Sequence, residues 1–414
     1  MNDTTLVSGV RGTALARLPF DALARRLLFA RLAHLDRGVL RVRDGGETHV
    51  FGAERTGVDA TIDVLDPAFY VDTALGGSVG VGESYMAGHW RADNLTALMR
   101  LMVDNRETLE AMETGLARVS APVRRAAHWL HRNTRGGARR NIAAHYDAGN
   151  DFFALVLDET MMYSCALFDR PGMSLAEAST AKLDAVCRRL ALGPADHVLE
   201  IGTGWGGFAL HAVRATGCRV TTTTISRSQY ELASERVCAA GLDGHVTVLL
   251  EDYRDLAGTY DKVVSIEMIE AIGHRQFEEF FRRCAARLVP GGPMLLQSIT
   301  IADERYAAAR DDVDFIKRHV FPGCCIPSVG ALVAAMASAS DLRVVRIDEI
   351  GPHYATTLAR WRENLLRSVD AVRALGYPDS FIRMWEFYLC YCEAGFAARA
   401  LGDVQMLLVR APPG

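Results

Sequence analysis

Residues 197–213 have the sequence HVLEIGTGWGGFALHAV. The run from His197 to Ile201 is typical of a buried strand, and Phe208 to Val213 has the pattern of a helix. Between them, Gly202 to Gly207 is a glycine-rich turn, and glycine lets the backbone approach a ligand closely. The stretch therefore predicts a strand, a nucleotide-type cradle and a helix of an α/β protein.

The spacing G-x-G-x-x-G alone does not distinguish a nicotinamide dinucleotide from S-adenosylmethionine. Dinucleotide enzymes usually hold the ribose with an acidic residue about 20 positions further on, but Thr224 stands at that distance from Gly204. At the end of the third predicted strand, Asp252 and Tyr253 supply an acid and an aromatic ring that could flank an adenine. The alternative for Asp252 is an ordinary acid in a loop. Taken together, these two features favour S-adenosylmethionine over a dinucleotide.

The sequence after residue 180 alternates between apolar strands and helices, which predicts a parallel, doubly wound sheet. The predicted strands are HVLEIG from His197, CRVTTTTI from Cys218, VTVLLED from Val246, KVVSIEM from Lys262, PMLLQSITI from Pro293, and Val404 to Arg410. The fold class is therefore α/β.

The N-terminal part has a different pattern. Phe20 to Leu35 predicts a basic amphipathic helix, and Gly38 to Phe51 alternates around Asp44-Gly45 like a β-hairpin. A small α+β unit follows from these two elements. Residues 1–43 carry three aspartates and eight arginines, Arg11, Arg17, Arg25, Arg26, Arg31, Arg37, Arg41 and Arg43.

A basic connector separates the two patterns. The segment 124–140 holds six arginines, two histidines and no acid, and it contains the pair Gly136-Gly137. Such a segment is typical of a solvated linker. The predicted domains are residues 1–135, which contact lipid, and residues 136–414, which carry catalysis.

The bulk composition excludes several classes of protein. The net charge of −4 over 414 residues gives no reason to expect a nucleic acid as partner. Nine scattered cysteines form no C-x-x-C pair, so neither a disulfide framework nor a metal site is predicted. No run of eighteen apolar residues occurs. These features favour a cytoplasmic protein that does not span the membrane.

Several motifs along the chain together resemble the cyclopropane-fatty-acyl-phospholipid synthase family, which includes the mycolic acid cyclopropane synthases. The likeness is strong over about residues 140–410 and weaker at GESYMAGHW, from Gly82. The motifs are HYD from His145, GNDFF from Gly149, YSC from Tyr163, EIGTGWGG from Glu200, TTISRSQ from Thr223, EDYRDL from Glu251, IEMIEAIG from Ile266, FIKRHVFPG from Phe315 and WEFYLCYCEAGF from Trp385.

The resemblance implies a class I methyltransferase fold, Rossmann-like, that binds S-adenosylmethionine. Gln229 would then take the place of the acid that is missing at the ribose. The predicted cofactor-binding residues are Tyr163, Ser164, Gly202, Gly204, Thr224, Ile225, Gln229, Asp252, Tyr253 and Ile266.

The reaction that the resemblance implies transfers a methylene unit to the cis double bond of an unsaturated acyl chain. An isolated alkene is a poor nucleophile, so the methyl donor must be held against it with water excluded. A proton must then leave the new methyl group before a ring can close. The family uses a bound bicarbonate as base, and the resemblance places it at Cys165, Glu270, Gln297, Ile299 and Tyr354.

Gln297 departs from the family pattern, which has histidine at this position. An amide can donate a hydrogen bond to bicarbonate, but it cannot accept a proton. A cyclopropane is the favoured product, and a methylene- or methyl-branched chain is the alternative. A non-catalytic lipid-binding protein is a third reading.

Simpler interpretations stand beside the catalytic one. Glu267 and Glu270 could form a solvated acidic face, and Cys165 and Tyr354 could be core residues. Aromatic side chains could line an acyl tunnel and stabilise a cation, although core packing explains most of them. These aromatic residues are Phe152, Phe153, Trp385, Phe387, Tyr388 and Tyr391.

The expected partner is an unsaturated acyl chain within a phospholipid, so the enzyme should dock on the inner face of the membrane as a peripheral protein. Arg25, Arg26, Arg31 and the connector could attract anionic head groups at about 1 kcal/mol for each charge. The alternative is that these arginines are solvated or paired. The resemblance also implies a homodimer.

Overall fold

The computed structural model describes residues 18–53, 57–111 and 149–412. The chain divides into two compact units, residues 1–122 and 123–414. The predicted connector, the domain boundary at residues 135/136 and the HYD motif lie outside the described residues, as do Arg11 and Arg17.

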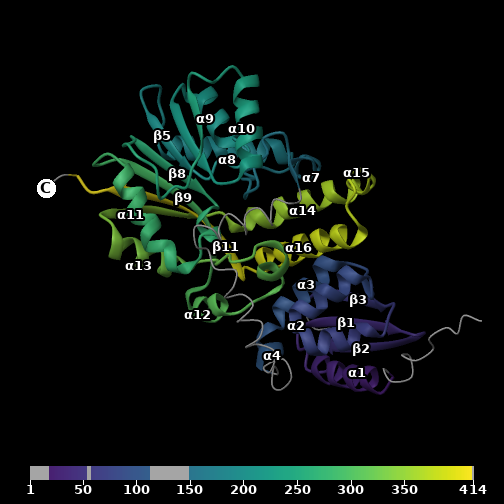
Figure 1. Ribbon diagram of the computed structural model, residues 1–414. Coiled ribbons are helices and arrows are strands. Elements are labelled where there is room, and N and C mark those ends of the chain that lie inside the picture. Colours follow the sequence, from purple (N-terminus) through teal and green to yellow (C-terminus); the bar gives the residue numbers. More distant parts are fainter. Residues whose placement is uncertain (1–17, 54–56, 112–148, 413–414) are drawn as a thin grey trace, which may run out of the picture. The chain divides into compact units, whose positions relative to one another are not determined.

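The first unit is a four-stranded sheet with helices, in the strand order β2-β1-β3-β4. The predicted hairpin is confirmed, and its turn lies at Gly45 and Gly46, one residue later than expected, because both have the positive φ that a tight turn needs. The elements are α1 (Leu18–Leu32), β1 (Gly38–Asp44), β2 (Glu47–Ala53), β3 (Asp59–Val64), α2 (Ala68–Ala87), β4 (Trp90–Ala92), α3 (Leu95–Asp104) and α4 (Arg106–Ala111) (Figure 1).

Helix α1 is less regularly amphipathic than predicted. Its residues Ala24 and Leu32 are buried, but Leu23 and Leu27 are 54% and 44% exposed. Arg25 turns back onto its own unit, where it pairs with Asp44 at 3.3 Å. One face of α1 is therefore apolar and open to solvent.

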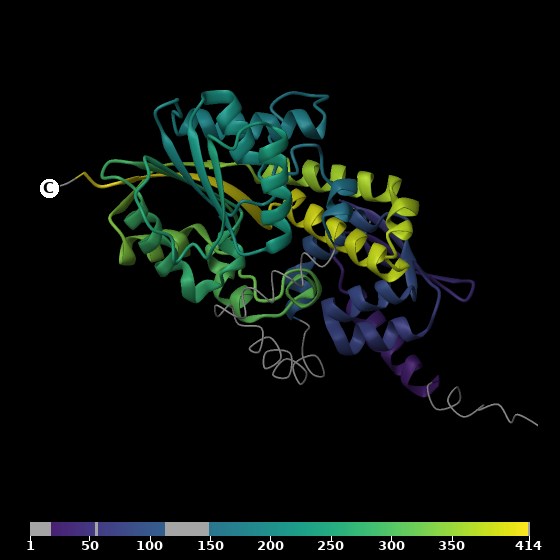
Figure 2. The ribbon, with the colours of Figure 1, turned by 45° about the horizontal axis from the view of Figure 1, so that its top comes forward.

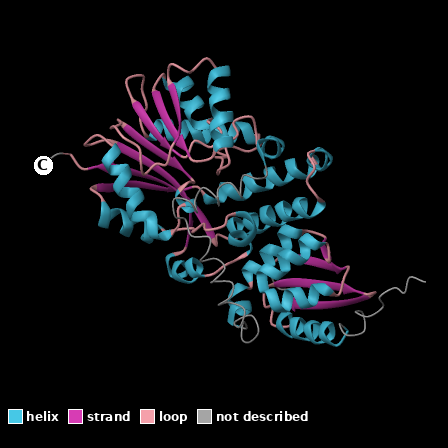
Figure 3. Ribbon diagram, viewed as in Figure 1, coloured by secondary structure: helices cyan, strands magenta, loops and turns pink. Residues whose placement is uncertain are grey.

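The second unit is built on a seven-stranded sheet in the order β10-β11-β9-β8-β5-β6-β7 (Figure 3). The strands β5 to β9 run parallel, and β11 is antiparallel to both β9 and β10. The strands are β5 (His197–Ile201), β6 (Arg219–Thr224), β7 (Val246–Leu250), β8 (Lys262–Ile266), β9 (Pro293–Ile301), β10 (Leu342–Glu349) and β11 (Leu401–Arg410). The predicted doubly wound α/β sheet is confirmed.

Helices cover both faces of this sheet because its central strands are apolar on both sides. On β5, Val198 packs with α8 (Leu175–Arg189), α9 (Gly207–Thr216) and α10 (Arg227–Ala239). Leu199 and Ile201 point to the other face and pack with α11 (Phe277–Arg287) and α13 (Val329–Ala339). Figure 1 shows α8, α9 and α10 on one side of the sheet and α11 and α13 on the other. The sequence order reverses between β5 and β8, which is where open α/β sheets bind ligands.

A group of helices lies near the end of the chain, before β11. Helices α14 (Gly351–Arg367) and α16 (Asp379–Ala397) pack side by side (Figure 2), with α7 (Gly149–Val156) and α15 (Val369–Ala374) against them. The remaining elements are the short helical turns Ile269–Ala271 and His274–Gln276, α12 (Asp303–Asp311) and the π-helical turn Ile316–Val320. In the part of the chain that the structure describes, no helix is long and apolar enough to cross a membrane.

Candidate active site

The glycine-rich loop after β5 forms an open cradle. Gly202, Gly204 and Gly206 have φ values of 103°, 52° and 81°, which side chains other than glycine rarely adopt. A Cβ atom added at Gly204 would meet no atom within 4 Å, so this side of the backbone is free for a ligand. The cradle leads into the N-terminus of α9, whose backbone N–H groups favour polar or anionic groups.

The end of β6 supplies the neighbouring polar groups. Ser226 caps α10 through a hydrogen bond from the backbone N–H of Gln229. The hydroxyl of Thr224 donates to Oε1 of Gln229 at 2.8 Å. That contact fixes the buried amide and orients its NH2 group as a donor, which a ribose hydroxyl oxygen can accept.

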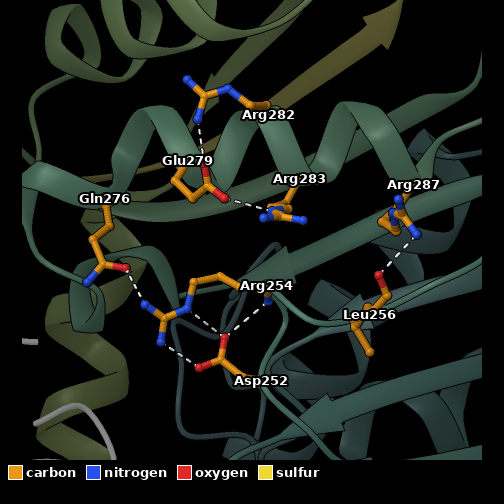
Figure 4. A network of polar contacts seen from close by, with 8 residues as sticks. All are labelled: Asp252, Arg254, Leu256, Gln276, Glu279, Arg282, Arg283 and Arg287. Atoms are coloured by element: carbon orange, nitrogen blue, oxygen red, sulfur yellow. Dashed lines mark hydrogen bonds and ion pairs between the residues drawn. The ribbon is translucent and has the colours of Figure 1, made fainter. Parts of the chain in front are cut away.

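Asp252 is held by an ion pair. The Nε of Arg254 donates to Oδ1 of Asp252 at 2.8 Å, and its Nη1 donates to Gln276 at 2.8 Å (Figure 4). The hydrogen bond that Arg254 donates to Asp252 raises the pKa of Arg254. Tyr253 is buried against the edge of Phe280, and burial raises its pKa. Contact between these two residues and the cofactor remains a prediction.

The segment before α8 brings Tyr163, Ser164 and Cys165 to the sheet. The hydroxyls of Tyr163 and Tyr388 lie 2.9 Å apart. The buried ammonium of Lys182 donates to Ser164 at 2.8 Å, and burial lowers the pKa of this lysine. Burial raises the pKa of the Cys165 thiol, which fits a role for its backbone rather than its sulfur.

Three of the predicted catalytic residues meet at Glu267, which was not predicted as a site residue. The backbone N–H of Cys165 donates to Oε1 of Glu267 at 2.8 Å, and Nε2 of Gln297 donates to the same oxygen at 2.7 Å. The hydroxyl of Tyr354 donates to Oε2 at 2.6 Å. One carboxylate therefore accepts hydrogen bonds from three separate segments of the chain.

Glu267 also has a strained backbone. Its φ is +48°, in the left-handed region, which costs on the order of 1–2 kcal/mol for a residue with a side chain. The turn that it starts is packed against the glycine cradle, because a Cβ atom at Gly202 would lie 3.1 Å from the side chain of Met268. The interpretation of Glu267 and Glu270 as a solvated acidic face is wrong, since both turn inward.

Glu270 and Ile299 meet each other rather than Glu267. Oε1 of Glu270 accepts from the backbone N–H of Ile299 at 2.6 Å and from the hydroxyl of Ser298 at 2.8 Å. Burial and the charge of Glu267 raise the pKa of Glu270 to about 8. Its other oxygen is buried and has no hydrogen-bond partner among the described residues.

Gln297 is fixed by further buried groups. Its Nε2 also donates to Asp403 at 3.0 Å, and its Oε1 accepts from Gln405 at 2.9 Å. Burial and the charge of Glu267 raise the pKa of Asp403 well above its ordinary value. Asp403 was not predicted as a site residue, because it lies one residue before the predicted strand Val404 to Arg410 and acids are mostly solvated.

Aromatic rings surround Tyr163. Its ring lies 5.1 Å from that of Trp361 and 5.3 Å from that of Phe153, and it is stacked on Phe321 at 6.3 Å. Phe153 in turn lies 4.8 Å from Trp205 in the glycine loop. Ring faces in such an enclosure can stabilise a cation by about 2 kcal/mol.

The donor set that the resemblance assigns to bicarbonate does not fit a separate anion here. Cys165, Gln297 and Tyr354 donate to Glu267, and Ile299 donates to Glu270. A further anion would have to displace Glu267 and sit among three acidic side chains, Glu267, Glu270 and Asp403.

The glycine cradle at the reversal point of the sheet, with Thr224 and Gln229 beside it, fits S-adenosylmethionine and defines a methyltransferase of the Rossmann-like class. Residues 133–406 match the sequence pattern of the family described as mycolic acid cyclopropane synthetase. The chain belongs to this family, and it is an S-adenosylmethionine-dependent enzyme that transfers a one-carbon unit to lipid acyl chains.

Relatives and solved structures agree with this assignment. The chain is 40% identical to tuberculostearic acid methyltransferase UfaA1 of Mycobacterium tuberculosis, over 81% of this chain and 80% of that one. It is 35% identical to the cyclopropane-fatty-acyl-phospholipid synthase of Escherichia coli, over 84% and 86%. The structure of mycolic acid cyclopropane synthase CmaA1 with SAH and CTAB superposes with a TM-score of 0.62 at 31% identity, covering 66% of this chain and 98% of that one.

Proposed function

We propose that this enzyme transfers a methylene unit from S-adenosylmethionine to the cis double bond of an unsaturated phospholipid acyl chain and forms a cyclopropane. The observation that carries the proposal is the position of the Glu267 carboxylate, held by three donors beside the glycine cradle. S-adenosylmethionine supplies an electrophilic methyl group there. The aromatic rings around Tyr163 exclude water and stabilise the cation that forms on the acyl chain.

A methylene-branched chain is the second candidate product. It is supported by the 40% identity to an enzyme named for tuberculostearic acid methylation and by Gln297 at the histidine position. Both products add one carbon and two hydrogens to the acyl chain, so mass does not distinguish them. A saturated methyl branch would also need a reductant.

The test is to incubate the purified protein with methyl-labelled S-adenosylmethionine and vesicles of monounsaturated phospholipid, with saturated vesicles as the matched control. We expect label in the unsaturated lipid alone, and NMR of the product to show ring or methylene protons. A binding protein without activity would leave both lipids unlabelled.

Access to the lipid is proposed to use the open face of α1. Leu23 and Leu27 are exposed there beside Arg26, and Leu23 and Leu27 are one helical turn apart. Arg25 is not part of this face, because it pairs with Asp44 and Glu47. In a sedimentation assay with anionic vesicles, Leu23→Ser combined with Leu27→Ser should weaken binding at least tenfold, and unchanged binding would contradict this use of α1.

Binding on the inner face of the membrane, cytoplasmic location and dimerisation remain predictions.

A further inference from the structure

The place that the family pattern reserves for a small anion is filled in this chain by a side chain. Cys165, Gln297 and Tyr354 come from three segments far apart in the sequence, and their donors converge on the carboxylate of Glu267. A glutamate that was merely a surface acid would not collect three donors from buried residues. The contacts show that the surrounding groups are arranged around this carboxylate.

The backbone at Glu267 supports a functional reason for its position. Its left-handed φ of +48° is unfavourable for glutamate, and such residues persist where the surrounding structure holds them for a purpose. The same turn places Met268 against Gly202 of the cradle, so Glu267 lies next to the loop expected to hold the methyl donor. The backbone strain at Glu267, its three hydrogen-bond donors and its place beside the cradle therefore all indicate a role in the reaction.

We infer that Glu267 is itself the catalytic base of the one-carbon transfer, held by Cys165, Gln297 and Tyr354, and that the enzyme needs no bound bicarbonate. The inference rests on the proposed function and deepens it. The two other acids are suited to remain neutral, because burial and the charge of Glu267 raise the pKa values of Glu270 and Asp403. Glu267 is the acid on which the three donors converge, so its carboxylate is the group placed to receive the proton.

The electron pair of the alkene forms a bond to the methyl carbon, and the pair of the breaking C–S bond stays on the sulfur. The neighbouring carbon becomes a cation. Glu267 takes a proton from the new methyl group, and the C–H electron pair closes the three-membered ring. If a hydride first moves from the methylated carbon to the cationic carbon, the same proton loss gives a methylene branch on an open chain.

The first experiment uses the unmodified protein in buffer purged of carbon dioxide, with and without added bicarbonate. We expect the rate of label transfer to unsaturated phospholipid vesicles to agree within twofold. A rate that collapses in purged buffer and returns with bicarbonate would overturn the inference while leaving the proposed function intact. No transfer under either condition would overturn the proposed function, and the inference with it.

The second experiment uses Glu267→Gly and Glu267→Gln. Glycine suits the left-handed backbone, so the variant should fold, and calorimetry with S-adenosylmethionine should show affinity within threefold of the parent. We expect both variants to lose at least about 100-fold in rate, as for removal of a general base. Added bicarbonate or formate should restore Glu267→Gly at least tenfold, but not Glu267→Gln, whose side chain fills the space.

The matched control is Ala191→Gly, because Ala191 has the same φ of 48° in a loop outside the site. This variant should keep the parental rate with and without bicarbonate. A rate for Glu267→Gln within threefold of the parent would refute the assignment of Glu267 as base.

Discussion

The hydroxyl of Tyr354 offers a direct measure of how much the donors contribute to the site. Tyr354→Phe removes the 2.6 Å hydrogen bond to Glu267 and keeps the ring, which is stacked on Phe396 at 4.4 Å. A hydrogen bond to a charged group contributes about 1.5–3 kcal/mol. If Tyr354 holds Glu267 in position for proton transfer, the loss corresponds to a roughly 10- to 150-fold fall in kcat.

The assay is label transfer from S-adenosylmethionine to monounsaturated phospholipid vesicles, with the KM for S-adenosylmethionine measured in parallel. We expect kcat to fall and this KM to stay within threefold, because Tyr354 does not lie at the cradle. Tyr260→Phe is the matched control, since Tyr260 is a buried tyrosine whose hydroxyl makes a long contact of 3.4 Å to Ala257. The reasoning is refuted if Tyr354→Phe loses less than threefold, or if both variants lose the same activity.

Three further predictions concern the cradle, a buried acid and the amide. Gly204→Ala should weaken binding of S-adenosylmethionine at least tenfold by calorimetry. The control Gly241→Ala, at a similar φ of 66° with equally open space, should lower stability by about 1 kcal/mol without affecting binding. Equal affinities of Gly204→Ala and the parent for S-adenosylmethionine would exclude a cradle at Gly204. Burial raises the pKa of Glu200 to about 8 from an ordinary 4.5, so the folded protein binds more protons than the unfolded chain between these values, and stability should fall as pH rises. The free energy of unfolding of the parent, measured with denaturant, should therefore fall by up to about 4 kcal/mol between pH 5 and pH 8 relative to that of Glu200→Gln, whose side chain does not titrate. Parallel profiles of unfolding free energy against pH would contradict a neutral Glu200 in the fold. Gln297→His should lower kcat about tenfold, because one imidazole N–H cannot replace an NH2 group that donates to both Glu267 and Asp403. An unchanged rate and an unchanged product by NMR would show that this position does not steer the reaction.

Much of the fold could be predicted from the sequence because its signals are local. The parallel strands are short apolar runs, and the turn after Ile201 is rich in glycine. The edge strand β10 was not predicted, because its residues from Arg343 to Asp348 are mostly exposed and include both arginines and apolar side chains. This mixture lacks the alternation that marks a half-buried strand.

The candidate site was less accessible to sequence reasoning. Cys165, Gln297 and Tyr354 were identified through the family resemblance, since no spacing links residues so far apart. Glu267 was not predicted as a site residue, and its spacing of three residues from Glu270 also allowed a solvated acidic face as the alternative. The chain instead leaves β8 through a left-handed residue, which redirects the side chain inward, and a pattern of residue types does not encode that change of direction.

The covalent attachment of Glu267 to the chain has a physiological consequence. A tethered group is present once per active site at an effective concentration that no change in the medium can alter. An enzyme that binds bicarbonate from solution as its proton acceptor would slow in acidic or degassed surroundings, where the concentration of bicarbonate falls. With Glu267 in this role, the cell could continue to remodel its lipids under those conditions, limited by the supply of methyl donor and unsaturated chains.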